Sequence, residues 1–235
     1  MTNILFPTPA PVLLPLRDGS GFFPVTRIFC VGRNYADHAK EMGHEVDREA
    51  PFYFTKSPAH LSPSGITIPY PPGTKDFHHE MEFVVAIGAP GFRVAQDKAL
   101  DLVFGYSAGL DMTRRDLQAQ AKDKRRPWDT SKDFEHGAIA APLSRAEEFG
   151  TPGPQTLSLL LNGEPVQRAH LSDMVWSVPE IIAHLSTLYH LGAGDLIFTG
   201  TPAGVGPVKP GDQLHGEVDG LAPVELMIAA PEAEV

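Results

Sequence analysis

Prolines and glycines interrupt this chain along its whole length, and their spacing limits what it can fold into. The 235 residues include 23 prolines and 22 glycines, which are spread out rather than gathered in one segment. Proline removes a backbone donor and glycine favours turns, so both residues tend to end regular elements. The segments between them are short, which favours many strands over a helix bundle. We therefore predict a β-rich α+β fold with a few short helices.

Composition excludes several classes of function. The formal net charge of −10 argues against nucleic-acid binding, which needs a basic surface to neutralise phosphates. No apolar run approaches the roughly 20 residues of a membrane span, and the first residues lack the basic stretch of a signal peptide. The single cysteine, Cys30, excludes an intramolecular disulfide framework and any cysteine-rich zinc site. We expect one main domain in a cytoplasmic protein.

Local patterns predict several elements. Alternation predicts strands over residues 23–31 and 78–88, and Asn34 is placed to cap a short helix. The Asn162-Gly163 pair predicts a hairpin that joins residues 156–162 to residues 164–167. A weak capping box at Thr113 and a second helix start at Ser177 predict two further helices. In the second of these, the side chains expected to face inward are Ile181, Ile182, Leu185, Leu188 and Tyr189. A terminal hairpin is expected from residues 213–218 and 224–228.

Three carboxylates are candidate metal ligands. Glu80 and Glu82 stand two apart in a predicted strand, so both leave the same face. Asp111 closes an otherwise apolar segment and is expected at a strand end. Like charges so close repel unless a cation lies between them, and carboxylates without cysteine suit Mg²⁺ or Mn²⁺, with Ca²⁺ also compatible. Spacing alone also allows a solvated strand face with no ion.

Other polar residues carry weaker signals. His38 and Glu41 are three apart on one predicted helix face, the arrangement of a general base and the carboxylate that orients it. On spacing alone, an exposed helix turn is the alternative. Lys56 and Lys132 could be ordinary surface lysines, and residues 122–126 a solvated basic helix end. The loop at residues 200–207 lacks the lysine of a phosphate-binding loop.

The order of these signals is more specific than any one of them. Over about residues 25–228 the chain resembles the fumarylacetoacetate hydrolase family, in particular its small bacterial acylpyruvate-cleaving members. The matching segments are collinear: VGRNYADHAKEMG, FTKSP, HHEMEF, GYSAGLDMTRRDLQ, RRPWDTSKDF, LNGEPVQ and GDLIFTGTPAGVGPVKPGD.

The resemblance implies a role for each candidate. Glu80, Glu82 and Asp111 match the metal ligands, and His38 with Glu41 matches the water-activating pair on a lid helix. The remaining matches are to polar residues around the substrate. Lys132 and Gln118 match catalytic positions, and Arg33, Lys56, Arg115 and Thr201 match substrate-binding positions.

The resemblance also implies an architecture and a reaction. It implies a mixed β-sandwich roll, usually a homodimer, with residues 1–20 as an N-terminal extension and residues 21–235 as one catalytic domain. Residues 21–60 would form a small subregion that carries the lid. The expected reaction is metal-dependent hydrolysis of an acylpyruvate carbon–carbon bond, with fumarylpyruvate giving fumarate and pyruvate in aromatic (gentisate) catabolism. Oxaloacetate decarboxylation or keto-acid tautomerisation is the alternative. A fumaryl group needs a cation for its distal carboxylate, for which Arg114, Arg125 and Arg126 are candidates.

Overall fold

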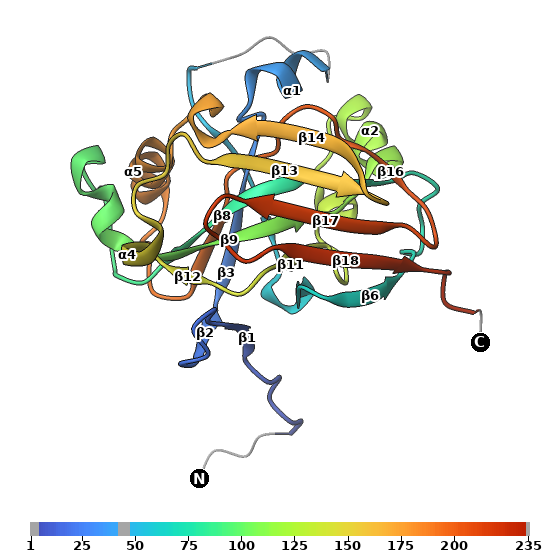
Figure 1. The fold of residues 1–235 in the computed structure, drawn as a ribbon, viewed down its shortest axis with the longest axis horizontal. Helices are drawn as coiled ribbons and strands as arrows, with labels where there is room; N and C mark the ends of the chain where they lie inside the picture. Colours follow the sequence, from blue (N-terminus) through green and yellow to red (C-terminus); the bar gives the residue numbers. More distant parts are fainter. Residues whose placement is uncertain (1–4, 42–47, 234–235) are drawn as a thin grey trace.

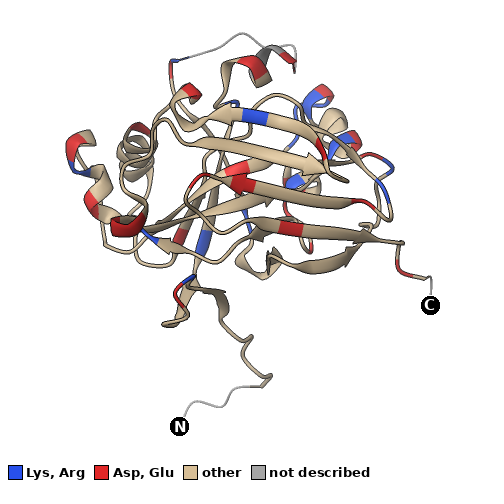
Figure 2. Cartoon of the chain, in the orientation of Figure 1, with Lys and Arg blue, Asp and Glu red and all other residues tan. Residues whose placement is uncertain are grey.

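The computed structural model describes residues 5–41 and 48–233. Figure 1 shows strands in packed layers, with the few helices at the edges of the molecule. This architecture confirms the predicted strand-rich class. None of the helices among the described residues is long and apolar enough to cross a membrane. Figure 2 shows lysines and arginines around α2 (Arg115–Asp123), with acidic residues among them.

The largest sheet has eight strands and is buried on both faces in its centre. Its order is β4-β3-β15-β8-β9-β11-β5, and β12 pairs with β9. Neighbouring strands are antiparallel except for two parallel pairs, β3 with β15 and β5 with β11. The strands are β3 (Arg27–Gly32), β4 (Phe52–Lys56), β5 (Leu61–Pro63), β8 (Met81–Ile87), β9 (Val103–Asp111), β11 (Ala138–Ala140), β12 (Ser144–Arg145) and β15 (Asp195–Phe198).

Side chains of β8 alternate between two apolar clusters. Phe83 and Val85 join the larger cluster, which lies between this sheet and a second one. Val84 and Ala86 join the smaller cluster on the opposite face. Because alternate residues of a strand leave opposite faces, one run of apolar residues supplies both clusters. The strand that carries Glu82 is therefore held rigidly from both sides.

The second sheet has five strands in the order β14-β13-β17-β18-β6 (Figure 1). It covers the larger cluster. The predicted hairpin is confirmed: Asn162 and Gly163 have φ of 54° and 85°, as a two-residue turn with both φ positive requires. The predicted terminal hairpin is also confirmed. The strands are β6 (Ile66–Pro69), β13 (Thr156–Leu161), β14 (Glu164–His170), β17 (Gln213–Val218) and β18 (Val224–Ala229).

The strand predicted over residues 78–88 is in fact two strands that meet at Glu80. The first, β7 (Phe77–His79), lies between β10 (Thr113–Arg114) and β16 (Gly206–Val208) in a three-stranded sheet. The second, β8, belongs to the eight-stranded sheet. The continuous-strand prediction was wrong here because the chain passes from one sheet to the other, which a local pattern of residues does not encode.

The strand predicted over residues 23–31 is also divided, at Thr26. Its first part, β2 (Phe22–Val25), forms a two-stranded sheet with β1 (Val12–Pro15), and Leu14 is buried in the smaller cluster. The second part is β3. The division of the chain into an extension, a domain and a subregion stays a prediction.

The helices follow their capping signals only in part. The helix expected to start at Ser177 is α5, in which Ser177 and Glu180 form a capping box, and Ile181, Ile182 and Leu185 are buried. Leu188 and Tyr189 are largely exposed, against prediction, because the helix ends at Leu188. No side chain caps α2, so the capping box at Thr113 was wrong. The helices are α1 (Ala36–Glu41), α2, α3 (Asp129–Lys132), α4 (Ala146–Phe149) and α5 (Val178–Leu188), with 3-10 turns η1 (Pro58–His60), η2 (Gln96–Leu102) and η3 (Leu171–Asp173).

Candidate metal centre and active site

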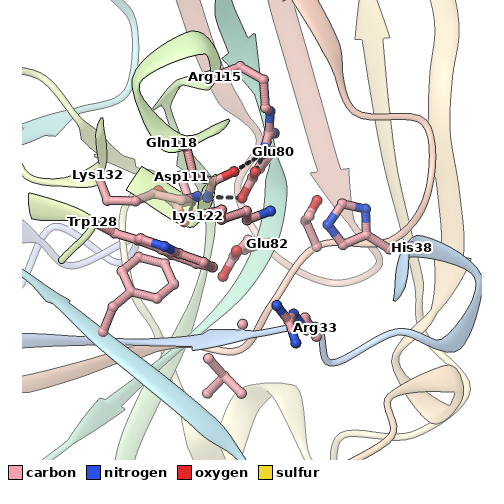
Figure 3. A pocket seen from close by; sticks show the side chains of 14 residues that line it. Arg33, His38, Glu80, Glu82, Asp111, Arg115, Gln118, Lys122, Trp128 and Lys132 are labelled. Carbon is pink, nitrogen blue, oxygen red and sulfur yellow. Dashed lines mark hydrogen bonds and ion pairs between the residues drawn. The ribbon is translucent and has the colours of Figure 1, made fainter. Parts of the chain in front are cut away.

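Three carboxylates from adjacent strands converge in one buried cluster (Figure 3). Glu80 lies between β7 and β8, Glu82 lies in β8, and Asp111 is the last residue of β9. The backbone N–H of Asp111 donates to the carbonyl of Glu80 at 2.9 Å, which joins the two segments. One carboxylate oxygen from each residue lies within 4.8 Å of the others. All three side chains are buried, so the solvated strand face is excluded.

Basic side chains neutralise part of this acidic cluster. Lys132 Nζ donates to Glu80 Oε2 and to Asp111 Oδ2, both at 2.7 Å. Arg115 Nη2 donates to Glu80 Oε1 at 2.5 Å, and Nη1 of the same side chain donates to Gln118 Oε1 at 2.7 Å. Lys132 is buried and is not a surface lysine. An ammonium group has three donors, so the two bonds of Lys132 leave one for a further partner.

Lys56 has a different place from the one predicted. Its Nζ forms an ion pair with Asp111 Oδ1 at 2.8 Å and donates to the carbonyls of Lys132 and Met112. The side chain is fully buried and is not among the residues that line the pocket. Lys56 therefore binds Asp111 and the backbone of Lys132 from the side of the cluster that faces away from the pocket. It is not placed to contact a ligand in the pocket.

The carboxylates differ in how well their charge is compensated. Burial opposes the charge of Glu80, but Lys132 and Arg115 outweigh it and hold the pKa of Glu80 far below its usual range. Burial, together with Asp111 and Glu80, raises the pKa of Glu82 well above its usual value. Burial also opposes the charge of Lys132, but Asp111 and Glu80 raise its pKa.

Glu82 is thus the carboxylate that needs a further cation. In the described part of the chain its carboxylate receives one hydrogen bond, from Gly200 N–H at 2.8 Å. A divalent ion would relieve the repulsion among the three carboxylates, and oxygen donors suit hard ions. The cluster therefore fits a divalent metal ion held by Glu80, Glu82 and Asp111.

A histidine–glutamate pair lies beside the cluster. Nδ1 of His38 is 3.2 Å from Glu41 Oε2, and both residues belong to α1. His38 is buried and lines the pocket, which excludes an exposed helix turn, and Figure 3 shows its ring directed at the carboxylates. The N–H of Gly204 contacts both oxygens of Glu41 at 3.2 Å. Burial lowers the pKa of His38, although Glu80 and Glu41 oppose that shift.

The side chain of Asn34 does not cap this helix as predicted. Its amide donates to the carbonyls of Thr199 and Trp176 and accepts from the N–H of Trp176. Asn34 therefore fixes the start of the α1 segment to the end of β15.

The loop after β15 contributes Thr201 to the pocket. Its contact with substrate stays a prediction. Gln167, which sequence patterns did not single out, holds this threonine. Its Nε2 donates to Thr201 Oγ1 and to the carbonyl of Pro202, both at 2.9 Å. Its Oε1 accepts from Met81 N–H at 3.0 Å and lies 3.2 Å from His79 Nδ1. One buried amide thus connects the loop to the two residues on either side of Glu80.

The structure brings most predicted site residues to one pocket and adds others. Arg33, predicted as substrate-binding, lines it with a left-handed φ of 59°. Lys122 and Trp128 were missed, because residues 122–126 suggested a solvated helix end and no sequence pattern singled out Trp128. Glu41 and Lys56 support the pocket without lining it. The lining residues are Val31, Gly32, Arg33, His38, Phe54, Glu80, Glu82, Asp111, Arg115, Gln118, Lys122, Trp128, Lys132 and Thr201.

This fold and site define an enzyme with buried carboxylates and basic residues around one pocket. The chain belongs to the fumarylacetoacetate hydrolase family: the model described as "Fumarylacetoacetate (FAA) hydrolase C-terminal" matches residues 27–229. The resemblance stated from the sequence is therefore confirmed.

The similar proteins described next are named either fumarylpyruvate hydrolase or oxaloacetate tautomerase. A fumarylpyruvate hydrolase from Ralstonia sp is 51% identical over 194 residues, covering 81% of this chain and all of the relative. The crystal structure of fumarylpyruvate hydrolase from Pseudomonas aeruginosa in complex with Mn²⁺ and pyruvate matches with a TM-score of 0.94 and 42% identity, covering 97% of this chain and 100% of that one. The mitochondrial oxaloacetate tautomerase of Homo sapiens is 40% identical over 205 residues, covering 87% of this chain and 92% of the relative.

Proposed function

We propose that this enzyme hydrolyses the carbon–carbon bond of an acylpyruvate, with fumarylpyruvate as substrate and fumarate and pyruvate as products. The observation that carries the proposal is the location of the His38–Glu41 pair beside the buried carboxylate centre. The fumarylpyruvate hydrolases of Ralstonia sp and Pseudomonas aeruginosa support the choice of substrate. Mg²⁺ or Mn²⁺ is the proposed ion, and when bound by Glu80, Glu82 and Asp111 it would supply Lewis-acid stabilisation of developing negative charge.

His38 would activate the attacking water. With its pKa lowered by burial, the imidazole is neutral and able to accept a proton. Glu41 orients the ring through Nδ1 and stabilises the imidazolium that forms, and the contact with Gly204 fixes Glu41 in turn. The water oxygen then bonds to the acyl carbonyl carbon.

Lys132 and Gln118 would stabilise the oxyanion formed in that attack. Lys132 has one N–H donor left beside its hydrogen bonds to Glu80 and Asp111. The side-chain oxygen of Gln118 accepts a hydrogen bond from Arg115, which leaves the amide N–H groups of Gln118 to donate to the oxyanion. The carbon–carbon bond then breaks, and its electron pair passes to the methylene carbon of the pyruvate fragment. Protonation of that carbon completes pyruvate, and the acyl fragment leaves as a carboxylate.

Replacement of Glu82 tests this proposal. Glu82→Gln removes one ligand charge but keeps the shape, so hydrolysis of fumarylpyruvate should fall to background while circular dichroism and thermal unfolding stay those of a folded protein. Calorimetric titration with Mn²⁺ should show weakened binding in the same variant. Unchanged turnover after exhaustive chelation would contradict the metal assignment. Absence of hydrolysis by the wild-type enzyme on fumarylpyruvate and acetylpyruvate would contradict the reaction itself.

Tautomerisation of oxaloacetate is a second candidate function, favoured by the identity to the human tautomerase. That reaction moves a proton and needs no attacking water. The predicted homodimer and cytoplasmic location rest on the family resemblance and the sequence, and they stay predictions.

A further inference from the structure

Two cations in the pocket have no carboxylate partner among the described residues. Arg115 and Lys132 are paired with Glu80, and Lys132 also with Asp111. Lys122 and Arg33 line the same pocket, but in the described part of the chain neither forms an ion pair with an acidic residue. Under the proposed function the pocket receives an anionic keto acid at its centre, and these two cations would remain at its wall for a further anionic group.

Lys122 is the more constrained of these two cations. It extends from the last turn of α2 into the pocket, and its Nζ lies 5.2 Å from the centroid of the Trp128 ring (Figure 3). Burial, followed by the charges of Arg115 and Arg33, lowers the pKa of Lys122 to about 8. A half-buried ammonium beside other cations is costly, and a bound anion would offset this cost.

The surface next to Lys122 is apolar and aromatic. Phe54 and Trp128 line the pocket beside it, with their rings 5.8 Å apart. A planar acyl chain can pack on such rings while a group at its end reaches the ammonium. None of the three arginines that the sequence suggested is among the residues that line the pocket. Arg114 packs on Phe134 and donates to Thr130 O, Arg125 is exposed, and Arg126 lines an adjoining hollow that shares Phe54, Trp128 and Lys132 with the pocket.

We propose that Lys122, with Arg33, forms a subsite for a second carboxylate at the far end of the acyl group. The ligand class is a short, planar acyl chain that ends in a carboxylate, and Trp128 supplies the face on which this chain lies. The subsite rests on the proposed function, because it explains which acylpyruvate the enzyme selects. It makes Lys122 a residue that determines specificity rather than one that takes part in bond cleavage.

Matched substrates test this assignment. Fumarylpyruvate carries the second carboxylate and acetylpyruvate lacks it. Lys122→Met should lower kcat/KM for fumarylpyruvate by on the order of 10- to 100-fold, mostly through KM, because a hydrogen bond to a charged group is lost. The same change should lower kcat/KM for acetylpyruvate by a clearly smaller factor, because that substrate has no second carboxylate. Lys122→Arg should keep most of the preference. Lys124→Met, the same change at an exposed lysine outside the pocket, is the control.

A binding measurement separates the subsite from the reaction. Fumarate and crotonate are both planar, but crotonate has a methyl group in place of the second carboxylate. In the presence of Mn²⁺, calorimetry should show that the wild-type enzyme prefers fumarate and that Lys122→Met loses this preference. That result would support the subsite even if neither acylpyruvate is hydrolysed, an outcome that would remove only the proposed function. Equal losses for both ligands or both substrates in Lys122→Met, or no preference in the wild type, would overturn the subsite.

Discussion

At the scale of single residues, His38 combines burial with acidic neighbours that act in the opposite direction. Burial lowers the pKa of its imidazole, whereas the charges of Glu80 and Glu41 raise it. The net shift is downward, so the neutral form that accepts a proton persists at a lower pH than for an exposed histidine. The sign of this pKa shift determines whether a reaction that uses His38 as base begins to lose rate above or below pH 6.5, the ordinary pKa of histidine.

The pH dependence of hydrolysis should reflect this shift. We expect kcat/KM to stay level as the pH falls through 6.5, the ordinary pKa of histidine. At more acidic pH it should decline by about tenfold per pH unit as His38 becomes protonated. Because Glu41 raises the pKa of His38, Glu41→Gln should move the acid limb to still lower pH. The measurement is kcat/KM at constant metal saturation, and an acid limb above pH 6.5 would contradict the assignment.

Replacement of His38 separates hydrolysis from metal-assisted decarboxylation of oxaloacetate. His38→Ala should reduce hydrolysis of an acylpyruvate on the order of 10²–10⁴-fold, the usual contribution of a general base. Loss of CO₂ from oxaloacetate needs no activated water and should decline less. Glu41→Gln should reduce hydrolysis by a smaller factor, because it removes only the orienting partner. The measurement is kcat/KM for both substrates at saturating Mg²⁺.

Equal losses of both activities would show that His38 positions substrate rather than activating water. The hydrolase proposal would then lose its mechanistic support, and decarboxylation or tautomerisation would become the better description.

At the scale of elements, Gln167 connects β14 with the Thr201 loop and with the backbone beside Glu80. Gln167→Leu would leave the N–H of Met81 and the hydroxyl of Thr201 without their partner. We expect a loss of stability of about 1–3 kcal/mol, the usual cost of an unsatisfied buried group, together with a raised KM. Thermal unfolding and steady-state kinetics measure the two effects. Gln213→Leu, at an exposed position of β17, is the control and should change neither.

If Gln167→Leu unfolds too readily for kinetics, Gln167→Glu provides a second variant. It keeps the acceptor for Met81 N–H but loses the donors to Thr201 and Pro202. A KM identical to that of the wild type in this variant would mean that Gln167 supports only the fold.

Sequence patterns predicted elements where short-range chemistry decides the structure. The Asn162-Gly163 turn and the helix start at Ser177 depend on neighbouring residues, and both were identified. The breaks at Thr26 and Glu80 were not, because they depend on which sheet each part of the chain joins. Family resemblance supplied the roles around the pocket. It did not distinguish Lys56, buried beneath Asp111, from residues that face a ligand, and patterns gave no sign that Lys122 and Gln167 face inward.

At the scale of the whole molecule, the family resemblance predicts a homodimer. Leu13 and Phe22, in the β1–β2 hairpin, are large apolar side chains that remain exposed, and burial of such side chains stabilises subunit contacts. Light scattering coupled to size exclusion should therefore give twice the 25.4 kDa chain mass at micromolar concentration. A mass equal to one chain under those conditions would contradict the prediction, and dilution would show how tightly the subunits associate.

The division of a strand at Glu80 has a mechanical consequence. Glu80 follows a strand of the small three-stranded sheet, whereas Glu82 and Asp111 belong to the large one. A small rotation of one sheet against the other therefore changes the spacing of the carboxylates. Substitutions in β16, far along the chain from all three acids, would tune the affinity for the ion by altering that alignment. A change in the angle between the two sheets would therefore alter the affinity for the metal ion while all three ligands stay the same.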